Sequence, residues 1–469
     1  MRTILSFVAV IGFTLAAAPT VHARQPNIVF LFADDLGYGD LRCYGHPYAR
    51  TPNLDQLAHD GTRFEQFHVT GVTCNPSRTG FMTSKWPASY RLYPADHGFG
   101  DQVTVTELLK KQGYRTGHFG KWHIGPDTDP GTYAIDVVGA GKESDAHSDP
   151  RGRDASIYDE AIEFIKQNKD QPFYMNVWGH ISHFPVNPPQ EYVDKFNGKN
   201  GDAVKVKDSD FSDYGQQKFA EVRKAGFDVD ECMRKYLAEV ASLDDSVGRL
   251  LKTLDDLGLH ENTIVVFSSD HGPAPISTAG SAKKDDRAKK KANPNRSADM
   301  RYNMLGYAGG LRGGKHTMYE GGVRVPFIVR WTGHVPAGRV DSTSVISGID
   351  WLPTLCAIVG APVDTTKFDG EDTSAAWLGS EFQRTKPLLW KVSKNRSDLA
   401  ILDGQWKLYS KYPYGAKGDV ELYNLSADPA ERRNVAGDNP KVVKRLVSQV
   451  DTWNDTLPAK YVKSTDKQD

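Results

Sequence analysis

The sequence has little cysteine and no excess of either charge. Only four of its 469 residues are cysteines, Cys43, Cys74, Cys232 and Cys356, and a chain so poor in cysteine is not a disulfide scaffold. The formal net charge is −1, so the chain lacks the overall positive field that attracts nucleic acid or an anionic membrane surface. We therefore expect a folded protein with a sizeable apolar core and no nucleic-acid partner.

Long apolar runs are also absent, except at the N-terminus. Arg2 precedes an apolar stretch from Ile4 to Ala18, and Val21-His22-Ala23 offers small residues for cleavage. This pattern predicts a signal peptide over residues 1–23, because the run is short for a membrane span. An apolar helix that is never removed is the alternative. We expect an exported protein, periplasmic or secreted, whose mature chain starts near Arg24 and has no membrane span.

Short apolar runs alternate with helical segments along residues 24–365. The runs are typical of strands buried on both faces of a parallel sheet and lie at 27–32, 64–69, 114–119, 172–178, 263–268 and 323–331. Helical features lie at 51–58, 78–83, 104–112, 156–167 and 232–257. The alternation predicts a large α/β domain with a mainly parallel mixed sheet flanked by helices. Residues 126–152 and 190–230 are expected to be loops.

The pattern changes after residue 365. Strand-like runs at 388–392, 399–409 and 420–425 are separated by turns, and a helix is predicted at 442–453. We expect residues 366–469 to form a small C-terminal α+β subdomain with an antiparallel sheet.

Polar residues follow two of the predicted strands directly. Asp34 and Asp35 come after the first strand, and Asp270 and His271 come after the strand at 263–268. Each pair taken alone is typical of a turn or a helix cap. Together they suggest one metal site, because ligands gather at the carboxyl ends of parallel strands. Three carboxylates favour a hard cation such as Ca²⁺, one per chain, with His271 as a less usual ligand.

Further polar residues lie in short glycine-rich or histidine-rich stretches. Lys121 and His123 share Gly-Lys-Trp-His-Ile-Gly and would point to one side of an extended segment. His183 lies in His-Ile-Ser-His-Phe-Pro, and Lys315 follows Gly313 and Gly314. A lone lysine is usually solvated, but the glycines around Lys315 suggest a close backbone approach.

Cys74 begins the stretch Cys-Asn-Pro-Ser-Arg. Cys-x-Pro-Ser-Arg resembles the signature at which a maturation enzyme oxidises cysteine to formylglycine (3-oxoalanine). Short patterns recur by chance, but the stretches around Asp34, Lys121, His183, Asp270 and Lys315 also resemble those of one family, in the same order. The chain thus resembles the type I, formylglycine-dependent sulfatases of the alkaline phosphatase superfamily, including exported arylsulfatases, N-acetylgalactosamine-6-sulfatases and polysaccharide sulfatases.

The resemblance implies a mechanism and a role for each residue. Cys74 as formylglycine is hydrated to a diol that attacks sulfur, and His123 takes a proton from the second hydroxyl as sulfate leaves. Arg78 supports the diol. Lys121, His183 and Lys315 hold the sulfate, and His183 or Lys315 assists the leaving oxygen. The implied metal ligands are Asp34, Asp35, Cys74, Asp270 and His271.

Two alternative functions stay open. Relatives with the same nucleophile hydrolyse phosphonate or phosphate esters, and relative rates on aryl sulfate and aryl phosphate separate these activities. A non-catalytic carbohydrate-binding relative is the other, although every expected catalytic position is filled.

The expected substrate is a sulfated carbohydrate, because an exported enzyme meets polysaccharides and its long polar loops can recognise them. These loops are residues 126–155, 190–230 and 273–312. The last contains a lysine-rich stretch at 281–296 that could attract a polyanion. A solvated insertion with no role in binding is the other interpretation of that stretch.

Overall fold

The computed structural model describes residues 25–125, 128–139, 149–198, 203–276, 298–391, 398–410 and 420–459. The predicted signal peptide and the lysine-rich stretch at 281–296 lie outside these ranges, as does part of each long loop.

An eight-stranded mixed sheet forms the centre of the molecule, in the order β5-β4-β6-β1-β7-β8-β2-β9. The strands of its first half, β5, β4, β6, β1 and β7, all run parallel. Strand β8 pairs antiparallel with β7 and β2, and β9 is parallel to β2. The bounds are β1 Asn27–Ala33, β2 Thr62–Phe64, β4 Arg115–Gly120, β5 Val137–Gly139, β6 Phe173–Trp178, β7 Thr263–Ser269, β8 Phe327–Arg330 and β9 Arg339–Asp341.

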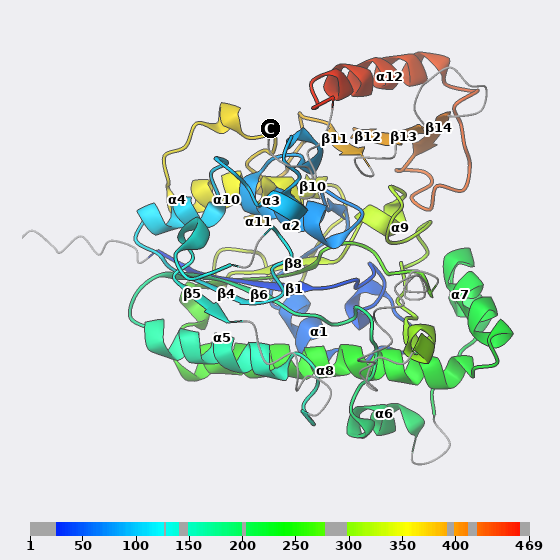
Figure 1. The fold of residues 1–469 in the computed structure, drawn as a ribbon, viewed down its shortest axis with the longest axis horizontal. Helices are drawn as coiled ribbons and strands as arrows, with labels where there is room; N and C mark the ends of the chain where they lie inside the picture. Colours follow the sequence, from blue (N-terminus) through cyan, green and yellow to red (C-terminus); the bar gives the residue numbers. More distant parts are fainter. Residues whose placement is uncertain are drawn as a thin grey trace, which may run out of the picture.

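Helices cover both faces of this sheet, so strand β1 is buried on both sides (Figure 1). One face packs on α1 (Pro52–His59), α5 (Ala155–Asn168) and the long α8 (Val229–Asp256). The other face packs on α2 (Cys74–Thr83), α4 (Val105–Lys111) and α10 (Trp351–Val359). Alternate β1 residues enter the two cores: Val29 and Leu31 face α8, whereas Phe30 and Phe32 face α2. The predicted α/β fold class is confirmed.

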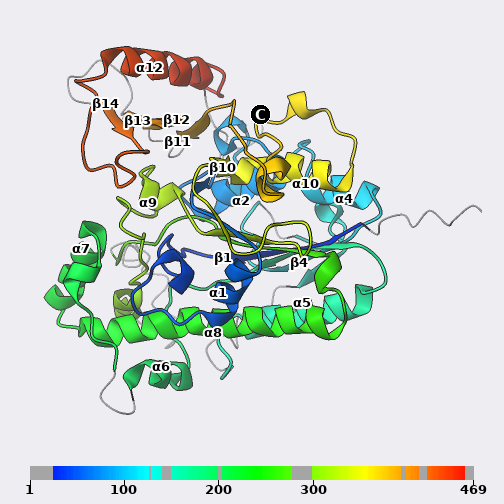
Figure 2. The same cartoon turned by 180° about the vertical axis from the view of Figure 1, so that it is seen from behind.

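A second, four-stranded antiparallel sheet lies near the C-terminus and carries helix α12 (Pro440–Asp455) on its outer side (Figure 2). Its order is β11-β12-β13-β14, with bounds Leu388–Lys391, Leu399–Asp403, Trp406–Ser410 and Val420–Asn424. This is the expected α+β subdomain. Strand β3 (Phe67–His68) pairs with β10 (Ile346–Ser347). The further α-helices of the described ranges are α3 Pro94–His97, α6 Gln190–Asn197, α7 Asp213–Lys224, α9 Glu320–Val323 and α11 Ser374–Trp377.

Several predicted elements differ from the observed ones. The run at 64–69 is two short strands in different sheets, and the run at 399–409 is a hairpin that turns at Gly404, whose φ is 60°. The run at 323–331 contains Pro326, which cannot donate to a ladder, and only β8 is strand. The expected loops at 126–152 and 190–230 contain β5 and the helices α6 and α7. Their buried apolar residues, such as Tyr192 and Phe219, join the core beneath α8.

Candidate active site

Three neighbouring parallel strands, β6, β1 and β7, end at the same edge of the sheet. Asp34 and Asp35 follow β1, Asp270 follows β7, and the loop with His183 follows β6. The turn after β1 is tight: Asp35 has a φ of 65°, and its backbone N–H donates to Asp270 Oδ1 over 3.1 Å. The Asp34 N–H donates to the carbonyl of Ile181, which fixes the β1 turn against the β6 loop.

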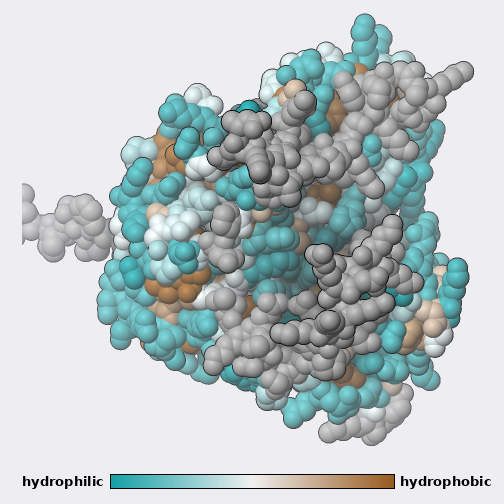
Figure 3. Space-filling view, in the orientation of Figure 1, coloured by the Kyte–Doolittle hydropathy of each residue, from teal (hydrophilic) through white to brown (hydrophobic). Residues whose placement is uncertain are grey.

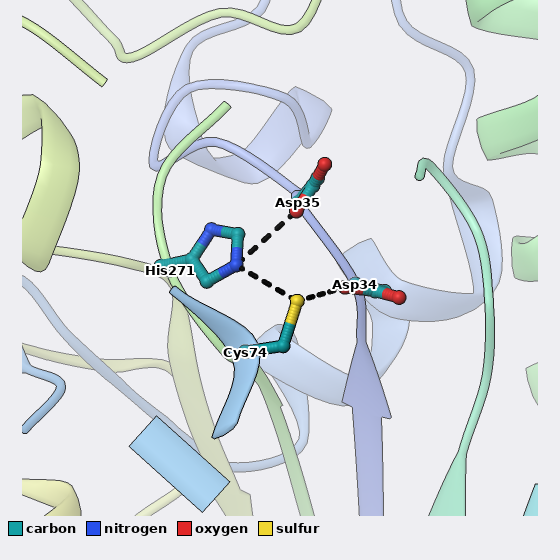
Figure 4. A group of neighbouring side chains, drawn as sticks. All are labelled: Asp34, Asp35, Cys74 and His271. Atoms are coloured by element: carbon teal, nitrogen blue, oxygen red, sulfur yellow. Dashed lines mark hydrogen bonds and ion pairs between the residues drawn. The ribbon is translucent and has the colours of Figure 1, made fainter. Parts of the chain in front are cut away.

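Cys74 is the first residue of α2, so its side chain points out of the helix start toward the end of β1 (Figure 4). Its Sγ lies 3.4 Å from Asp34 Oδ1 and 3.4 Å from His271 Nε2, and only 3% of the residue is exposed. Burial, and then the charges of Asp34 and Asp270, raise the pKa of the thiol well above its usual value. Burial thus disfavours the thiolate of an unmodified Cys74, and the thiolate is the nucleophilic form of cysteine.

A group of potential metal ligands surrounds this sulfur. Ligand atoms of Asp34, Asp35, Cys74 and His271 lie within 4.8 Å of one another, and all four residues are buried. Asp35 Oδ2 has no hydrogen-bond partner in the described part of the chain, as expected for an oxygen that serves a cation. Asp270 borders the group, with Oδ1 3.5 Å from His271 Nε2. The residues present fit one divalent cation, whose identity they do not specify.

Three cations balance the carboxylates. Lys121 Nζ pairs with Asp34 Oδ2, and Lys315 Nζ lies 2.7 Å from Asp35 Oδ1. Burial would raise the pKa of both carboxyls, but Lys121 and Lys315 respectively oppose it most strongly, so both pKa values are lowered. The two ammonium groups also approach Cys74 Sγ, at 3.4 Å for Lys121 and 3.9 Å for Lys315.

Arg78 is the third cation and is fully buried one turn after Cys74. It donates from Nη2 and Nε to Asp270 Oδ2, at 3.0 and 3.3 Å, and from Nη1 to the carbonyl of Lys121 at 2.8 Å. Its guanidinium lies over the rings of Phe32 and Trp178. Arg78 thus ties α2 to the end of β7 and to the residue that follows β4.

The lysine-bearing stretch packs tightly against the end of β7. A Cβ added to Gly272 would meet the Gly321 carbonyl oxygen at 1.8 Å. The Lys315 N–H donates to Pro273 O over 3.0 Å, and the His316 N–H donates to Val72 O over 2.9 Å. The close backbone approach that the glycines suggested is present.

Comparison with known proteins identifies the family. The family model described as Sulfatase matches residues 26–361. The chain belongs to the sulfatase family. A second model, described as the C-terminal part of N-sulphoglucosamine sulphohydrolase, matches residues 313–455.

Individual relatives agree with this sulfatase assignment. Arylsulfatase A of Homo sapiens is 31% identical, with 92% of this chain and 88% of that protein covered. The N-acetylgalactosamine-6-O-sulfatase of Bacteroides thetaiotaomicron is 28% identical, with 91% and 92% covered. The crystal structure of Ps i-CgsB superposes with a TM-score of 0.71 at 25% identity, covering 94% of this chain and 96% of the other, and that protein has also been solved with k-i-k-neocarrahexaose. The chain is accordingly a sulfuric ester hydrolase.

Two predicted histidines lie at the rim of the sulfatase site. His123 is exposed and has a φ of 57°, so it does not lie on an extended segment with Lys121 as expected. Strand β4 ends at Gly120, and the Asn75 side-chain amide donates to His123 O over 2.9 Å, which holds the turn. Although its surface is partly exposed, the surrounding chain removes part of the water around the imidazole; this desolvation, and then the charge of Lys121, lower the pKa of His123 to about 4. His183 is half-buried, and its Nδ1 lies 2.8 Å from the carbonyl oxygen of Phe184.

Sequence reasoning missed the residues that hold the His183 loop. Arg153 donates to the carbonyls of His180, His183 and Pro185. Asp154 accepts from the N–H groups of His180 and Ile181. Both residues precede α5 in a stretch rich in Gly, Asp and Pro, where an Arg-Asp pair gives no signal of a distant partner.

Two observations concern the surface of the sulfatase and its helices. The coloured residues of the face seen in Figure 3 are mainly hydrophilic, with scattered apolar patches. Among the described residues, no helix is long and apolar enough to cross a membrane.

Proposed function

We propose that this sulfatase hydrolyses sulfate esters of carbohydrates, using formylglycine made from Cys74 and one bound Ca²⁺. The observation that carries the proposal is the convergence of Arg78, Lys121 and Lys315 on a buried cysteine beside Asp34, Asp35 and His271. Such a site is suited to an anionic ester, because fixed cations at a dry site stabilise charge that develops in the transition state.

The carboxyl-rich group is the proposed metal site. Asp34, Asp35, Asp270, His271 and residue 74 would hold the cation, which would supply positive charge to the nucleophile and to the sulfate oxygens. Calcium is favoured by the oxygen ligands, since hard cations prefer carboxylates.

The other residues have the following proposed roles, which their positions around residue 74 support. Lys121 and Lys315 bind sulfate oxygens, and His183 joins them from the β6 loop. Arg78 orients residue 74 from within α2. His123, neutral at pH 7 because its pKa is about 4, accepts a proton from a hydroxyl of residue 74. The hydrated aldehyde at that position would supply the attacking hydroxyl and a second hydroxyl whose loss of a proton expels sulfate.

The carbohydrate part of the proposal is supported by the relatives. One relative is named for N-acetylgalactosamine 6-O-sulfate, and Ps i-CgsB has been solved with a neocarrahexaose. Which sugar and which position this enzyme takes are left to a panel of defined sulfated oligosaccharides.

The test begins with the residue at position 74. Peptide mass spectrometry on active enzyme is expected to find the aldehyde or its hydrate, installed by a formylglycine-generating maturation enzyme. The Cys74→Ala variant is expected to fold but not to turn over an aryl sulfate. Full activity with an intact thiol would refute the proposed nucleophile, and faster turnover of aryl phosphate than of aryl sulfate would favour a phosphate ester hydrolase.

Two further experiments address substrate and location. Good turnover of aryl sulfates without desulfation of any carbohydrate in the panel would retire the carbohydrate assignment. We also propose export by the signal peptide at residues 1–23, and N-terminal sequencing of the secreted protein should begin near Arg24. Finding Met1 on that protein would contradict cleavage.

A further inference from the structure

The segment that carries Lys315 contacts the small antiparallel sheet. We call residues 312–323 the lysine segment and residues 388–455 the C-terminal unit. Helix α9, at the end of the lysine segment, lies directly below this sheet in both views (Figures 1 and 2). The contacts between them occur at the two ends of the lysine segment, on either side of Lys315.

Arg312 makes the contacts at the first end. Its Nη1 donates to Tyr423 Oη over 2.6 Å and to the carbonyl of Glu431 over 3.3 Å, and it pairs with Glu421 at 3.4 Å. Its guanidinium carbon lies 3.8 Å from the centre of the Tyr319 ring. That ring stacks on Tyr409 of β13, so both residues of the lysine segment reach the C-terminal unit.

Glu320 makes the contacts at the second end, in a fully buried charge cluster. Its Oε1 lies 2.7 Å from Lys407 Nζ, and its Oε2 lies 3.0 Å from His68 Nε2. Its backbone N–H donates to Glu431 Oε2 over 2.6 Å, and Glu431 Oε1 lies 3.2 Å from Lys407 Nζ. Lys407 on β13 therefore bridges two carboxylates: Glu320 of the lysine segment and Glu431 of the C-terminal unit.

Full burial makes this cluster sensitive to the loss of one member. Glu320, Lys407 and His68 are 0% exposed and Glu431 is 1% exposed. Burial alone would raise the pKa of Glu320, but Lys407 and then His68 hold it well below its usual value. Removing Lys407 leaves Glu320 with only the longer pairing to Arg324, at 3.5 Å, among the cations of the described residues. Loss of one partner of a buried ion pair is strongly destabilising, so we expect Glu320 to shift.

The two ends are joined so that the lysine segment is a closed loop. The Gly321 N–H donates to Arg312 O over 2.8 Å, and Gly322 packs against Thr317 O and Gly314 O. A shift of Glu320 therefore moves the backbone on which Lys315 stands. Lys315 Nζ reaches Asp35 at 2.7 Å and Cys74 at 3.9 Å, and small displacements at such a site are costly to catalysis.

We propose that Lys407 and Glu431 are positioning residues for Lys315, acting through Glu320 and the lysine segment. The inference rests on the proposed role of Lys315 in sulfate binding. It gives the C-terminal unit a part in the reaction, although none of its described residues belongs to the ligand group around Cys74.

The first experiment measures kcat/KM on an aryl sulfate for Lys407→Met in two backgrounds. In otherwise wild-type enzyme we expect at least a tenfold fall. In the Lys315→Ala background we expect little further fall, because the residue that Lys407 positions is already absent. The matched control is Arg445→Met, which breaks an ion pair with Asp403 in the same C-terminal unit, away from the lysine segment, and should leave kcat/KM unchanged.

A second variant guards against misfolding. Lys407→Met combined with Glu431→Gln removes the lysine together with the ionisable carboxyl of Glu431, so one fewer buried carboxyl is left without Lys407. We expect it to fold and to show the same dependence on Lys315. Equal falls of kcat/KM in both backgrounds, or wild-type kcat/KM in a folded Lys407 variant, would overturn the proposal.

A third measurement is independent of activity. Hydrogen exchange of amides in residues 312–323 should be at least tenfold faster in Lys407→Met than in wild type or Arg445→Met. Unchanged exchange would overturn the inference even if the enzyme is active. If the wild-type enzyme proved inactive while Lys407→Met still showed this accelerated exchange, only the proposed function would be contradicted.

Discussion

Lys315 shows how a single residue contributes to the site. Its ammonium reaches Asp35 and Cys74 from a backbone fixed by Pro273. We expect Lys315→Ala to lower kcat/KM on an aryl sulfate by an amount equivalent to roughly 2–4 kcal/mol, as when a fixed transition-state donor is lost. Lys252→Ala is the control, because Lys252 is exposed and pairs only one turn along α8 with Asp256. An unchanged kcat/KM in Lys315→Ala would remove this lysine from the site.

His118 provides a pH test of stability at the same scale. Its ring is fully buried and lies edge-on to Trp122 and Trp178. Burial, and then the charge of Arg78, lower its pKa from 6.5 to about 3. Between pH 6.5 and 3, His118 binds a proton in the unfolded chain but stays neutral in the folded chain. The free energy of unfolding therefore falls as the pH falls through this range.

The expected result is a difference between two pH profiles. In wild type the free energy of unfolding should lose up to about 1.4 kcal/mol per pH unit from this residue within that window. The melting temperature of His118→Phe should therefore fall less between pH 7 and pH 5 than that of wild type. Parallel profiles for the two proteins would show that His118 takes up its proton equally well in both states.

At the scale of single elements, the loop after β6 depends on the residues before α5. Arg153 donates to three carbonyls of this loop, including that of His183. Arg153→Ala removes these three bonds, at about 1–3 kcal/mol for each carbonyl that stays buried without another donor; the His180 carbonyl keeps the bond from the His183 N–H. We expect a lower kcat/KM on aryl sulfate and a lower melting temperature.

Arg151 is the matched control for Arg153. It lies two residues earlier, its side chain is 48% exposed, and within the described ranges it forms ion pairs with Asp149 and Asp159. Arg151→Ala should change neither measurement appreciably, since exposed ion pairs contribute little. Equal effects of the two substitutions would mean that the β6 loop does not need Arg153.

The elements also show what the sequence can predict. Strands β1, β6 and β7 are continuous apolar runs followed by polar residues, so their positions and the meeting of Asp34 with Asp270 were predictable from parallel-sheet geometry. The direction of His123 was not, because its φ of 57° depends on the hydrogen bond from Asn75. Helices α6 and α7 were missed because their apolar faces, for instance Phe219, are narrow and pack only against α8 and its neighbours.

At the scale of the whole molecule, the predicted metal should couple activity to stability. Without a metal ion, the charge of the buried carboxylates is balanced by Lys121, Lys315 and Arg78. Chelation should therefore lower the melting temperature, and Ca²⁺ at about 100 times its Kd should restore about 2.7 kcal/mol.

The calcium prediction has a control variant and two outcomes that would contradict it. Asp35→Ala, which removes a proposed ligand, should lose the calcium-dependent shift in melting temperature. Metal analysis should find one calcium per chain. Stoichiometric zinc in fully active enzyme, or no shift on adding Ca²⁺, would overturn the calcium assignment.

The pairing of β1 with β7 has a consequence for biosynthesis. Asn27 lies opposite Thr263, 236 residues later in the chain. At synthesis rates of about 5–20 residues per second, roughly 10–50 seconds separate the emergence of the two strands from the ribosome. Throughout that interval the apolar β1, destined for burial on both faces, has an open edge, which is the kind of surface that aggregates or recruits chaperones. The strand that places Asp34 and Asp35 is therefore made long before its pairing with β7 can be completed.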